Sequence, residues 1–375
     1  MKIYPLSIMI LTVLSLVKLH ALERPDITYK IFQFPADKIP RIDGEIDDWE
    51  IVPESYRVRT DQMVEDEGRY KQLDPETLDI CVRVGWVKGL NRLYFLYEAY
   101  DNYWDFSLPD LHNDTFEIVV DGDASGGVLI DKGHREMYTS EHVGPGLIKS
   151  DERIPVSEAN WAIHSVHAQN YHIFAPAENK AWTLVWGVQP WIKELPFANA
   201  AYSYDFKAGE SGNLVLEFWI TPFDYAGPEG PERAVPSVLE ENKIIGLAWA
   251  VIDYDDVNSP RKDGFWNLSS QHRMYGQASY LCAFQLMPVE AQLRPPIKAQ
   301  WSFSVLDMDI RRVAFRDESL GKITGWKWDF GDGHSSEEQH PFHQYEKPGS
   351  YTVILDVSGS EGESRMSKVW EVTVK

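Results

Sequence analysis

The sequence predicts an all-β protein, in which a large β-sandwich is followed by a small β-sandwich. The main evidence is a series of short runs, bounded by Gly, Asp, Asn and Pro, in which apolar and polar residues alternate. These runs include residues 93–97, 115–120, 182–188, 214–220 and 244–252. Almost no stretch has the apolar period of an amphipathic helix. Pro288, Pro295 and Pro296 interrupt any regular element and indicate a linker at residues 288–300.

Residues 1–21 have the features of a secretory signal. Lys2 precedes the apolar run 6–17, and Ala21 supplies a small residue for cleavage. The run is too short to span a membrane. We therefore expect an exported protein, periplasmic or secreted, that begins at about Leu22 and has no membrane span.

Charge and cysteine content narrow the choice of partners and compartments. The formal net charge of −22 opposes nucleic acid as a partner, because a negative field repels a phosphate backbone. An anionic ligand would need a local cationic pocket. Cys81 and Cys282 lie in apolar, strand-like runs, and two alternatives stay open for them: a disulfide, or two buried free thiols.

The carboxy-terminal part carries a distinctive motif. It consists of Trp326-Lys-Trp-Asp-Phe-Gly-Asp-Gly333, then Pro341, His343 and Tyr345, then the alternating run 348–357. Trp328 and Phe330 share one side of a strand and would fill the space between two sheets. On these residues, the segment 301–375 resembles a PKD domain, an immunoglobulin-like sandwich. The resemblance implies a spacing, stiffening or weakly adhesive role without catalysis.

Residues 22–287 carry a second set of motifs. In order they are Arg41-Ile-Asp-Gly-Glu-Ile-Asp-Asp-Trp49, Leu93-Tyr-Phe-Leu-Tyr-Glu-Ala-Tyr-Asp101, Asp114-Thr-Phe-Glu-Ile-Val-Val-Asp-Gly-Asp123, Ile245-Gly-Leu-Ala-Trp-Ala-Val-Ile-Asp-Tyr-Asp255, Trp266 and Tyr275-Gly276. This order resembles the family 9 carbohydrate-binding modules, which are β-sandwiches. The pattern fades at about residues 131–212, which we interpret as a divergent insertion. The resemblance implies a carbohydrate partner.

Acidic clusters in this section have two interpretations. Asp121 and Asp123, in a Gly-rich turn, would either bind calcium or cap backbone amides. Asp253, Asp255 and Asp256 leave the same two alternatives. The turn lacks the ligand ladder of an EF-hand loop. Calcium is therefore the one cofactor that the sequence leaves open, and no other cofactor is identified.

The region from residue 134 to residue 172 is unusually rich in histidine, with five of the chain's 11. Its first part, residues 131–153, has four Lys or Arg against five Asp or Glu. If residues 161–174 form a strand, alternation places His164 and His172 on one side and His167 and Tyr171 on the other.

A second strand at residues 182–188 would complete a hairpin and present Trp182 and Trp186 on one face. Such a hairpin suits a sugar, whose apolar faces stack on indoles. The predicted substrate-binding residues are Trp104, Trp161, Trp182, Trp186 and Lys180.

Imidazole and phenol groups point to acid–base chemistry on an acidic sugar. Abstraction of the proton next to the sugar carboxylate requires that a cation neutralise this carboxylate, after which His or Tyr takes the proton. The predicted catalytic residues are His134, Arg135, Tyr138, His164, His167 and Tyr171. The alternative for each is a hydrogen-bonded structural residue in a strand. A metal ligand among the histidines is not identified.

The overall organisation, an exported sandwich with a PKD domain, is similar to that of the oligosaccharide dehydratases encoded with ulvan-degrading enzymes in marine bacteria. This resemblance implies removal of water from a uronic acid at the non-reducing end of an oligosaccharide, which leaves a 4,5-unsaturated uronate. The alternative hypothesis is a non-catalytic protein that captures acidic oligosaccharide or polysaccharide.

Overall fold

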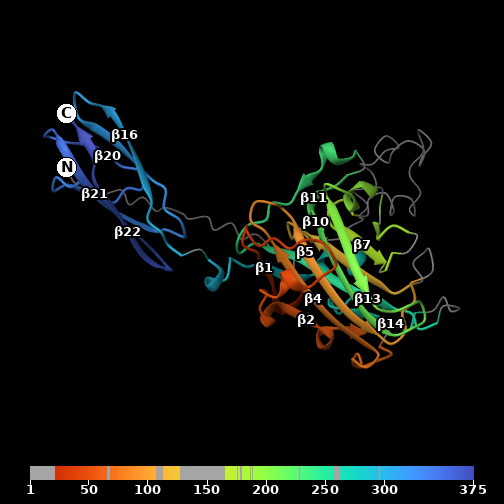
Figure 1. Cartoon of the computed structure of the whole chain (residues 1–375). Helices are drawn as coiled ribbons and strands as arrows, with labels where there is room; N and C mark the ends of the chain where they lie inside the picture. The colour runs from red at the N-terminus through yellow and green to blue at the C-terminus, as the bar shows by residue number, and fades with distance from the viewer. Residues whose placement is uncertain are drawn as a thin grey trace, which may run out of the picture. The chain divides into compact units, whose positions relative to one another are not determined.

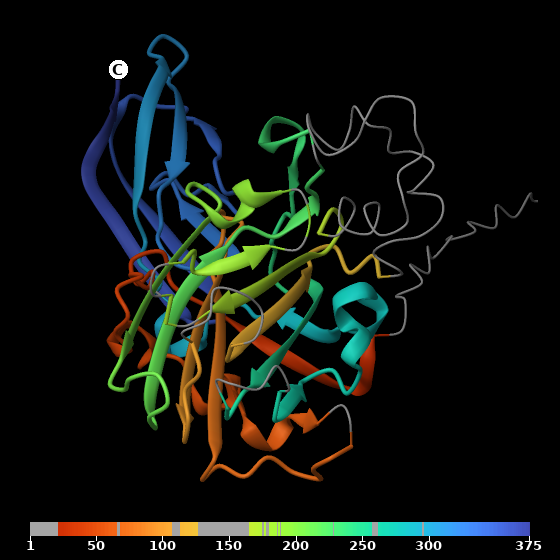
Figure 2. The ribbon, with the colours of Figure 1, turned by 90° about the vertical axis from the view of Figure 1, so that its right-hand side faces the viewer.

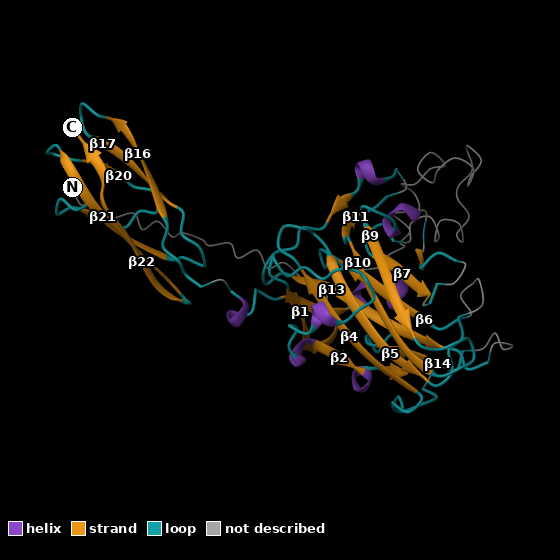
Figure 3. Cartoon of the chain, viewed as in Figure 1, coloured by secondary structure: helices purple, strands orange, loops and turns teal. Residues whose placement is uncertain are grey.

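The computed structural model describes residues 22–65, 68–106, 113–126, 165–174, 176–177, 180–185, 187, 189–227, 229–256, 262–294 and 296–375. The chain divides into two compact units, residues 1–288 and residues 289–375, and each is described here by itself (Figure 1). The predicted all-β class is confirmed, because both units consist of strands with only short helices (Figure 3). No described helix has the length and apolar character needed to cross a membrane.

The large unit is built on one extended sheet. Its strands are β1 (Glu23–Gln33), β2 (Arg57–Arg59), β3 (Val64–Glu65), β4 (Leu78–Trp86), β5 (Leu93–Asp101), β6 (Thr115–Asp121), β7 (Gln169–Phe174), β8 (Thr183–Val185), β9 (Ala198–Tyr204), β10 (Gly212–Ile220), β13 (Ile244–Asp253), β14 (Gly264–Asn267) and β15 (Cys282–Leu286). The order is β8-β7-β6-β13-β15-β1-β4-β5-β10-β9, with β14, β3 and β2 attached beside it. A separate ribbon pairs β11 (Phe223–Tyr225) with β12 (Val235–Pro236).

Short 3-10 helices connect the strands. They are η1 (Asp47–Trp49), η2 (Glu54–Tyr56), η3 (Thr60–Gln62), η4 (Pro190–Lys193), η5 (Pro231–Arg233), η6 (His272–Gly276), η7 (Ala278–Tyr280) and η8 (Ala291–Leu293). Pro190 and Pro231 begin their helices, where a fixed φ is already suitable and no backbone N–H is lost from the helix.

The extended sheet curls into two layers (Figure 2). Strand β1 links them, because its residues 23–31 pair in parallel with β15 and its last two residues pair in parallel with β4. Aromatic side chains fill the space between the layers. Tyr97 on β5 stacks on Phe116 of β6 with ring centroids 4.2 Å apart, and Phe116 also meets the edge of Phe218 on β10. These contacts hold β5 and β10 against the β6 layer.

A buried carboxylate explains the motif at residues 41–49. Glu217 on β10 accepts hydrogen bonds from the Trp49 indole at 2.6 Å and from the amide of Gly44 at 2.9 Å. Gly44 has a φ of 84°, which glycine adopts without strain. The Ile-Asp-Gly turn is therefore a structural clamp on the outside of β10.

Cys81 on β4 and Cys282 on β15 are both buried and free. The disulfide alternative is therefore wrong, and the free-thiol alternative is confirmed. Burial raises the pKa of Cys282 to about 12, so this thiol is protonated and acts as a small apolar side chain.

The small unit is a two-sheet sandwich. One sheet contains β16 (Trp301–Asp307), β17 (Arg312–Asp317) and β20 (Phe342–Gln344), and the other contains β18 (Gly325–Asp329), β19 (Ser335–Ser336), β21 (Gly349–Gly359) and β22 (Gly362–Val374). Trp328 and Phe330 are buried between the sheets, as predicted. The Trp328 indole packs edge-on against Trp301 at 5.6 Å and donates to the carbonyl of Glu338.

Candidate functional site

The strands of the large unit run between two ends, which we name after one residue at each. Antiparallel pairing brings the start of β7 and the start of β13 to one end, together with the ribbon β11–β12; this is the His167 end. The opposite end, where β5 and β13 finish, is the Asp101 end. Each end gathers a different set of polar side chains.

At the His167 end, an imidazole and a phenol lie side by side. The His167 ring is 5.7 Å from the ring of Tyr225 on β11, centroid to centroid. Two bonds hold the segments together: His167 Nδ1 lies 3.1 Å from the carbonyl of Asp224, and the amide of Ala226 donates to the carbonyl of Val166 at 2.8 Å. His167 and Tyr225 are both half-buried, so neither is sealed within the core.

Hydrogen bonding defines the chemistry of this pair. A carbonyl only accepts, so the contact with Asp224 places the proton on Nδ1 of His167 and leaves Nε2 as the proton-accepting nitrogen of the neutral ring. The Tyr225 hydroxyl donates to the carboxylate of Glu229, at 3.0 and 2.9 Å from its two oxygens. The His167 end therefore combines a base, a phenol and an exposed carboxylate.

Tyr171 and His172 occupy different positions from those that catalysis would need. Tyr171 on β7 is fully buried in the main core, and burial raises the pKa of its phenol well above the usual range. His172 faces the other side of β7, next to Glu117, with Nε2 and Oε1 3.4 Å apart. Burial lowers the pKa of His172 to about 3, so its ring is neutral. Tyr171 therefore packs in the core and is not placed to take part in catalysis, because its side of β7 faces the core.

The predicted hairpin exists, as β7 and β8 pair in antiparallel register. Trp182, just before β8, is half-buried against Phe218 and donates to the carbonyl of Lys193 at 3.1 Å. Trp104 is buried, stacks on Phe206 at 4.6 Å and donates to the carbonyl of Gly212. Trp104 is therefore a core residue and not an exposed sugar platform.

Lys180 lies at the Asp101 end of the sheet. Its ammonium group donates to the carbonyl of Phe106 at 2.8 Å and to the side chain of Asn113 at 3.3 Å, and it lies over the ring of Phe174. These contacts tie the chain around residues 106 and 113 to the end of β7. The other predicted site residues lie outside the described part of the chain: His134, Arg135, Tyr138, Trp161, His164 and Trp186.

The Asp101 end also holds a group of carboxylates. Asp101, Asp253 and Asp255 each offer an oxygen within 4.8 Å of the others. Asp253 is about 9% exposed, and its Oδ1 has no hydrogen-bond partner among the residues that the structure describes. Burial, together with the charge of Asp255, raises the pKa of Asp101 to about 7. Asp114 lies close by with its pKa also raised by burial and by Asp101.

The electrostatic repulsion among these buried carboxylates is removed either by protons shared between the carboxyl groups or by a bound cation. Oxygen ligands of this kind are the type that calcium prefers. Of the two acidic clusters considered from the sequence, Asp253 and Asp255 therefore retain the calcium interpretation, and Asp101 joins them. In the other cluster, Asp121 accepts from the amide of Gly126 at 2.8 Å and Asp123 accepts from the amide of Ser125 at 3.0 Å, which is backbone capping.

An aromatic row on the edge strand β9 was not among the predicted site residues. Tyr202 and Tyr204 alternate onto one face of β9, and their ring centroids are 6.2 Å apart. Tyr204 is 36% exposed and continues to Phe206 at 5.1 Å. The spacing Tyr-Ser-Tyr-Asp-Phe was the available signal, because alternate aromatic residues on a strand share one face.

Comparison with known proteins gives clear results for the small unit. Residues 308–374 match the family model of the PKD domain. Collagenase ColQ1 of Bacillus cereus (strain Q1) is 48% identical over 60 residues, which are 16% of this chain and 6% of the collagenase. A microbial collagenase of Vibrio alginolyticus is 52% identical over 42 residues, 11% of this chain and 5% of that protein. The match thus spans only a small fraction of these relatives.

Solved structures also resemble parts of this chain. A family 9 carbohydrate-binding module from Caldicellulosiruptor kristjanssonii in complex with cellotriose has a TM-score of 0.43 at 14% identity, over 72% of this chain and 98% of that chain. The PKD1 domain of the Vibrio cholerae metalloprotease PrtV has a TM-score of 0.20 at 27% identity, over 22% of this chain and 99% of that chain. The family-model match shows that the carboxy-terminal unit carries a PKD domain at residues 308–374.

Proposed function

We propose that this is an exported carbohydrate-active protein whose large unit removes water from a uronic acid at the non-reducing end of ulvan-type acidic oligosaccharides. The observation that supports this most directly is the contact of His167 with Tyr225, which pairs an imidazole with a phenol outside the core. The product would be a 4,5-unsaturated uronate.

The chemistry follows from the tautomer of His167. Nε2 takes the proton from C5 of the sugar, next to the carboxylate, while the Tyr225 hydroxyl protonates the leaving hydroxyl at C4. The C5–H and C4–O bonds break, a C4–C5 double bond forms, and one water leaves. A cation must neutralise the sugar carboxylate for this proton to be acidic. Arg135, outside the described residues, is the predicted source of that charge.

The test is incubation of the purified protein with uronate-terminated oligosaccharides. Dehydration gives new ultraviolet absorbance and a mass loss of one water without chain shortening. His167→Ala and Tyr225→Phe should each abolish turnover, and Tyr225→Phe keeps the ring against His167. Tyr70→Phe is the matched control, because Tyr70 is an exposed tyrosine stacked on Trp266 elsewhere in the same unit. Full activity in both site variants would overturn the assignment, and chain shortening would indicate a lyase.

The second candidate function is capture of an acidic glycan without catalysis. The exposed Tyr204, next to the half-buried Tyr202 on β9, favours it, because sugar rings stack on exposed aromatic faces. In this case calorimetry shows saturable binding of an oligosaccharide that is recovered unchanged. Tyr204→Ala should weaken that binding, while Tyr204→Phe should preserve the stacking surface and most of the affinity.

A further inference from the structure

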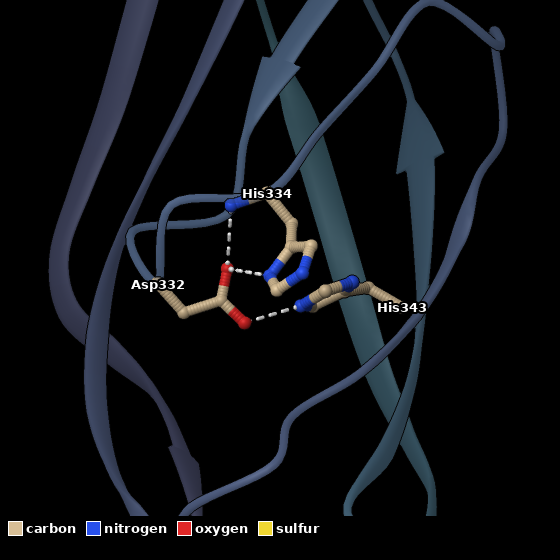
Figure 4. Close-up of side chains that lie close together, drawn as sticks. All are labelled: Asp332, His334 and His343. Carbon is tan, nitrogen blue, oxygen red and sulfur yellow. Dashed lines mark hydrogen bonds and ion pairs between the residues drawn. The ribbon is translucent and has the colours of Figure 1, made fainter.

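The turn at the end of β18 places three metal-ligating side chains together in the small unit. Gly331 and Gly333 have φ values of 81° and 93°, and they bend the chain on either side of Asp332. The turn returns His334 over Asp332, whose Oδ1 accepts the amide of His334 at 3.1 Å. His343, on β20 of the other sheet, approaches the same carboxylate (Figure 4).

The distances between the donor atoms are close to those of a metal site. Nε2 of His343 lies 2.7 Å from Asp332 Oδ2, and Nδ1 of His334 lies 3.4 Å from Asp332 Oδ1. One ligand atom from each residue lies within 4.8 Å of the other two. Ligand bonds of about 2.0–2.1 Å in a tetrahedron separate neighbouring ligand atoms by about 3.3 Å. The trio therefore needs only a small opening of the Asp332–His343 contact to admit an ion.

The three ligands differ in how firmly they are held. The His343 ring is stacked on Phe330, with centroids 4.1 Å apart and planes 5° apart, and it meets the edge of Tyr345 at 4.5 Å. His334, by contrast, is about 61% exposed in its side chain and has room to turn. Asp332 is held between them, because its Oδ1 accepts the amide of His334 and its Oδ2 contacts Nε2 of His343.

We propose that Asp332, His334 and His343 form a binding site for a divalent first-row transition metal, with zinc as the ion it suits best. Two imidazoles and one carboxylate are a ligand set of zinc, whereas calcium takes oxygen ligands almost exclusively. A fixed His343 and Asp332 supply a preorganised pair, and His334 closes on the ion. Three protein ligands leave the fourth tetrahedral position for water or for a ligand from outside.

The test uses the full mature chain, freed of any purification tag and of metal. Calorimetric titration with zinc should show a site that His334→Ala weakens at least about tenfold. Cobalt at the same site should give the visible absorption bands of tetrahedral coordination, and these bands should be absent in His334→Ala. The matched control is His340→Ala, which removes another exposed histidine of the same unit and should leave both signals unchanged.

His334 is the residue to substitute because it is exposed, so its loss does not disturb the core. Circular dichroism of the metal-free variant checks that the fold is intact. Absence of zinc binding by the unsubstituted chain overturns the proposal. So does binding that is the same in His334→Ala, because the ion would then lie at other histidines of the chain, such as those between residues 134 and 172.

Discussion

His167 and His172 lie close together in the chain, but their surroundings give them different chemistry. His167 is half-buried beside Tyr225, and its Nδ1–H donates a hydrogen bond to the backbone carbonyl of Asp224. His172 is buried on β7, and desolvation lowers its pKa to about 3. A histidine that stays neutral through the physiological range contributes packing and hydrogen bonding, and this is the role of His172.

The depressed pKa of His172 predicts a pH dependence of stability. In the unfolded chain the residue has a pKa of about 6.5, so the unfolded state binds more protons as the pH falls below that value. The stabilising contribution of neutral His172 is fully present above about pH 6.5 and is lost progressively toward about pH 3.

Urea unfolding of the large unit at a series of pH values measures this effect. His172→Gln should flatten the loss of stability between about pH 6.5 and about pH 4, relative to the unsubstituted protein. Asp101, with a pKa raised to about 7, contributes the opposite slope in both proteins, so the difference between the two curves isolates His172. Parallel curves would contradict the assignment.

The carboxylates at the Asp101 end predict a calcium effect. Near and above pH 7 these buried groups must ionise close to one another, which is unfavourable without a cation. Calcium should raise the melting temperature of the large unit at neutral pH, by an amount that follows its concentration over its dissociation constant. Asp255→Asn should remove most of this effect and Asp256→Asn should not, because Asp255 belongs to the trio. Equal responses of both variants would refute the site.

At the scale of single elements, the glycine turn after β18 shows how backbone and side-chain requirements combine. Gly331 and Gly333 both have positive φ. A Cβ added at Gly331 would clash with the carbonyl oxygen of Thr352, whereas a Cβ at Gly333 would meet nothing within 4 Å. Both positions therefore need a residue that tolerates positive φ, but only at Gly331 would a side chain also clash with a neighbouring strand.

Gly331→Ala and Gly333→Ala form a matched pair of variants. Both should destabilise the small unit by about 1 kcal/mol or more through backbone strain, and Gly331→Ala should cost more because the turn must also move away from Thr352. Thermal unfolding of the small unit gives the comparison. Equal losses of stability would show that the turn shifts freely.

Local patterns predicted several elements correctly. Alternation at Trp328 and Phe330 identified a strand with one face in a core, and the two runs around residue 180 identified the β7–β8 hairpin. Alternation also assigned His172 and Tyr171 to opposite sides of β7. It could not say which side faces the core, because both sides of that strand are buried.

The rest of the candidate site depends on contacts that no local pattern contains. Tyr225 reaches His167 only because β11 is tied to the segment before β7. Asp101 meets Asp253 because β5 and β13 end at the same end of two opposed layers. Such pairings follow from the topology of the sheet. The sequence motif therefore identified Asp253 and Asp255 as candidate ligands but did not identify Asp101 as the third.

At the scale of the whole molecule, the two units have separate cores. The chain divides between Pro288 and Val289, beside the predicted linker at residues 288–300, and the Trp86 indole holds the carbonyl of Met287 on the large-unit side. The buried residues of the small unit form their own cluster around Trp328. Each unit therefore has the interior that it needs to fold without the other.

This division predicts that a chain ending at Pro288 keeps the proposed dehydration or oligosaccharide binding. Removal of residues 289–375 leaves the His167 end and the Asp101 end unchanged, because all their described residues belong to the large unit. Turnover or oligosaccharide affinity of the truncated chain should match that of the full chain within about twofold, a difference of about 0.4 kcal/mol. A large loss would show that the PKD domain takes part in the reaction or in binding.

Strand β1 has a consequence for the order in which the protein is made. Its parallel neighbour β15 is synthesised at the far end of the large unit, with Ile31 paired to Leu286. During synthesis, the edge of β1 that pairs with β15 therefore stays unpaired until β15 has been synthesised. A pairing of such long sequence separation forms slowly, which leaves a long interval in which the nascent large unit is open to chaperones.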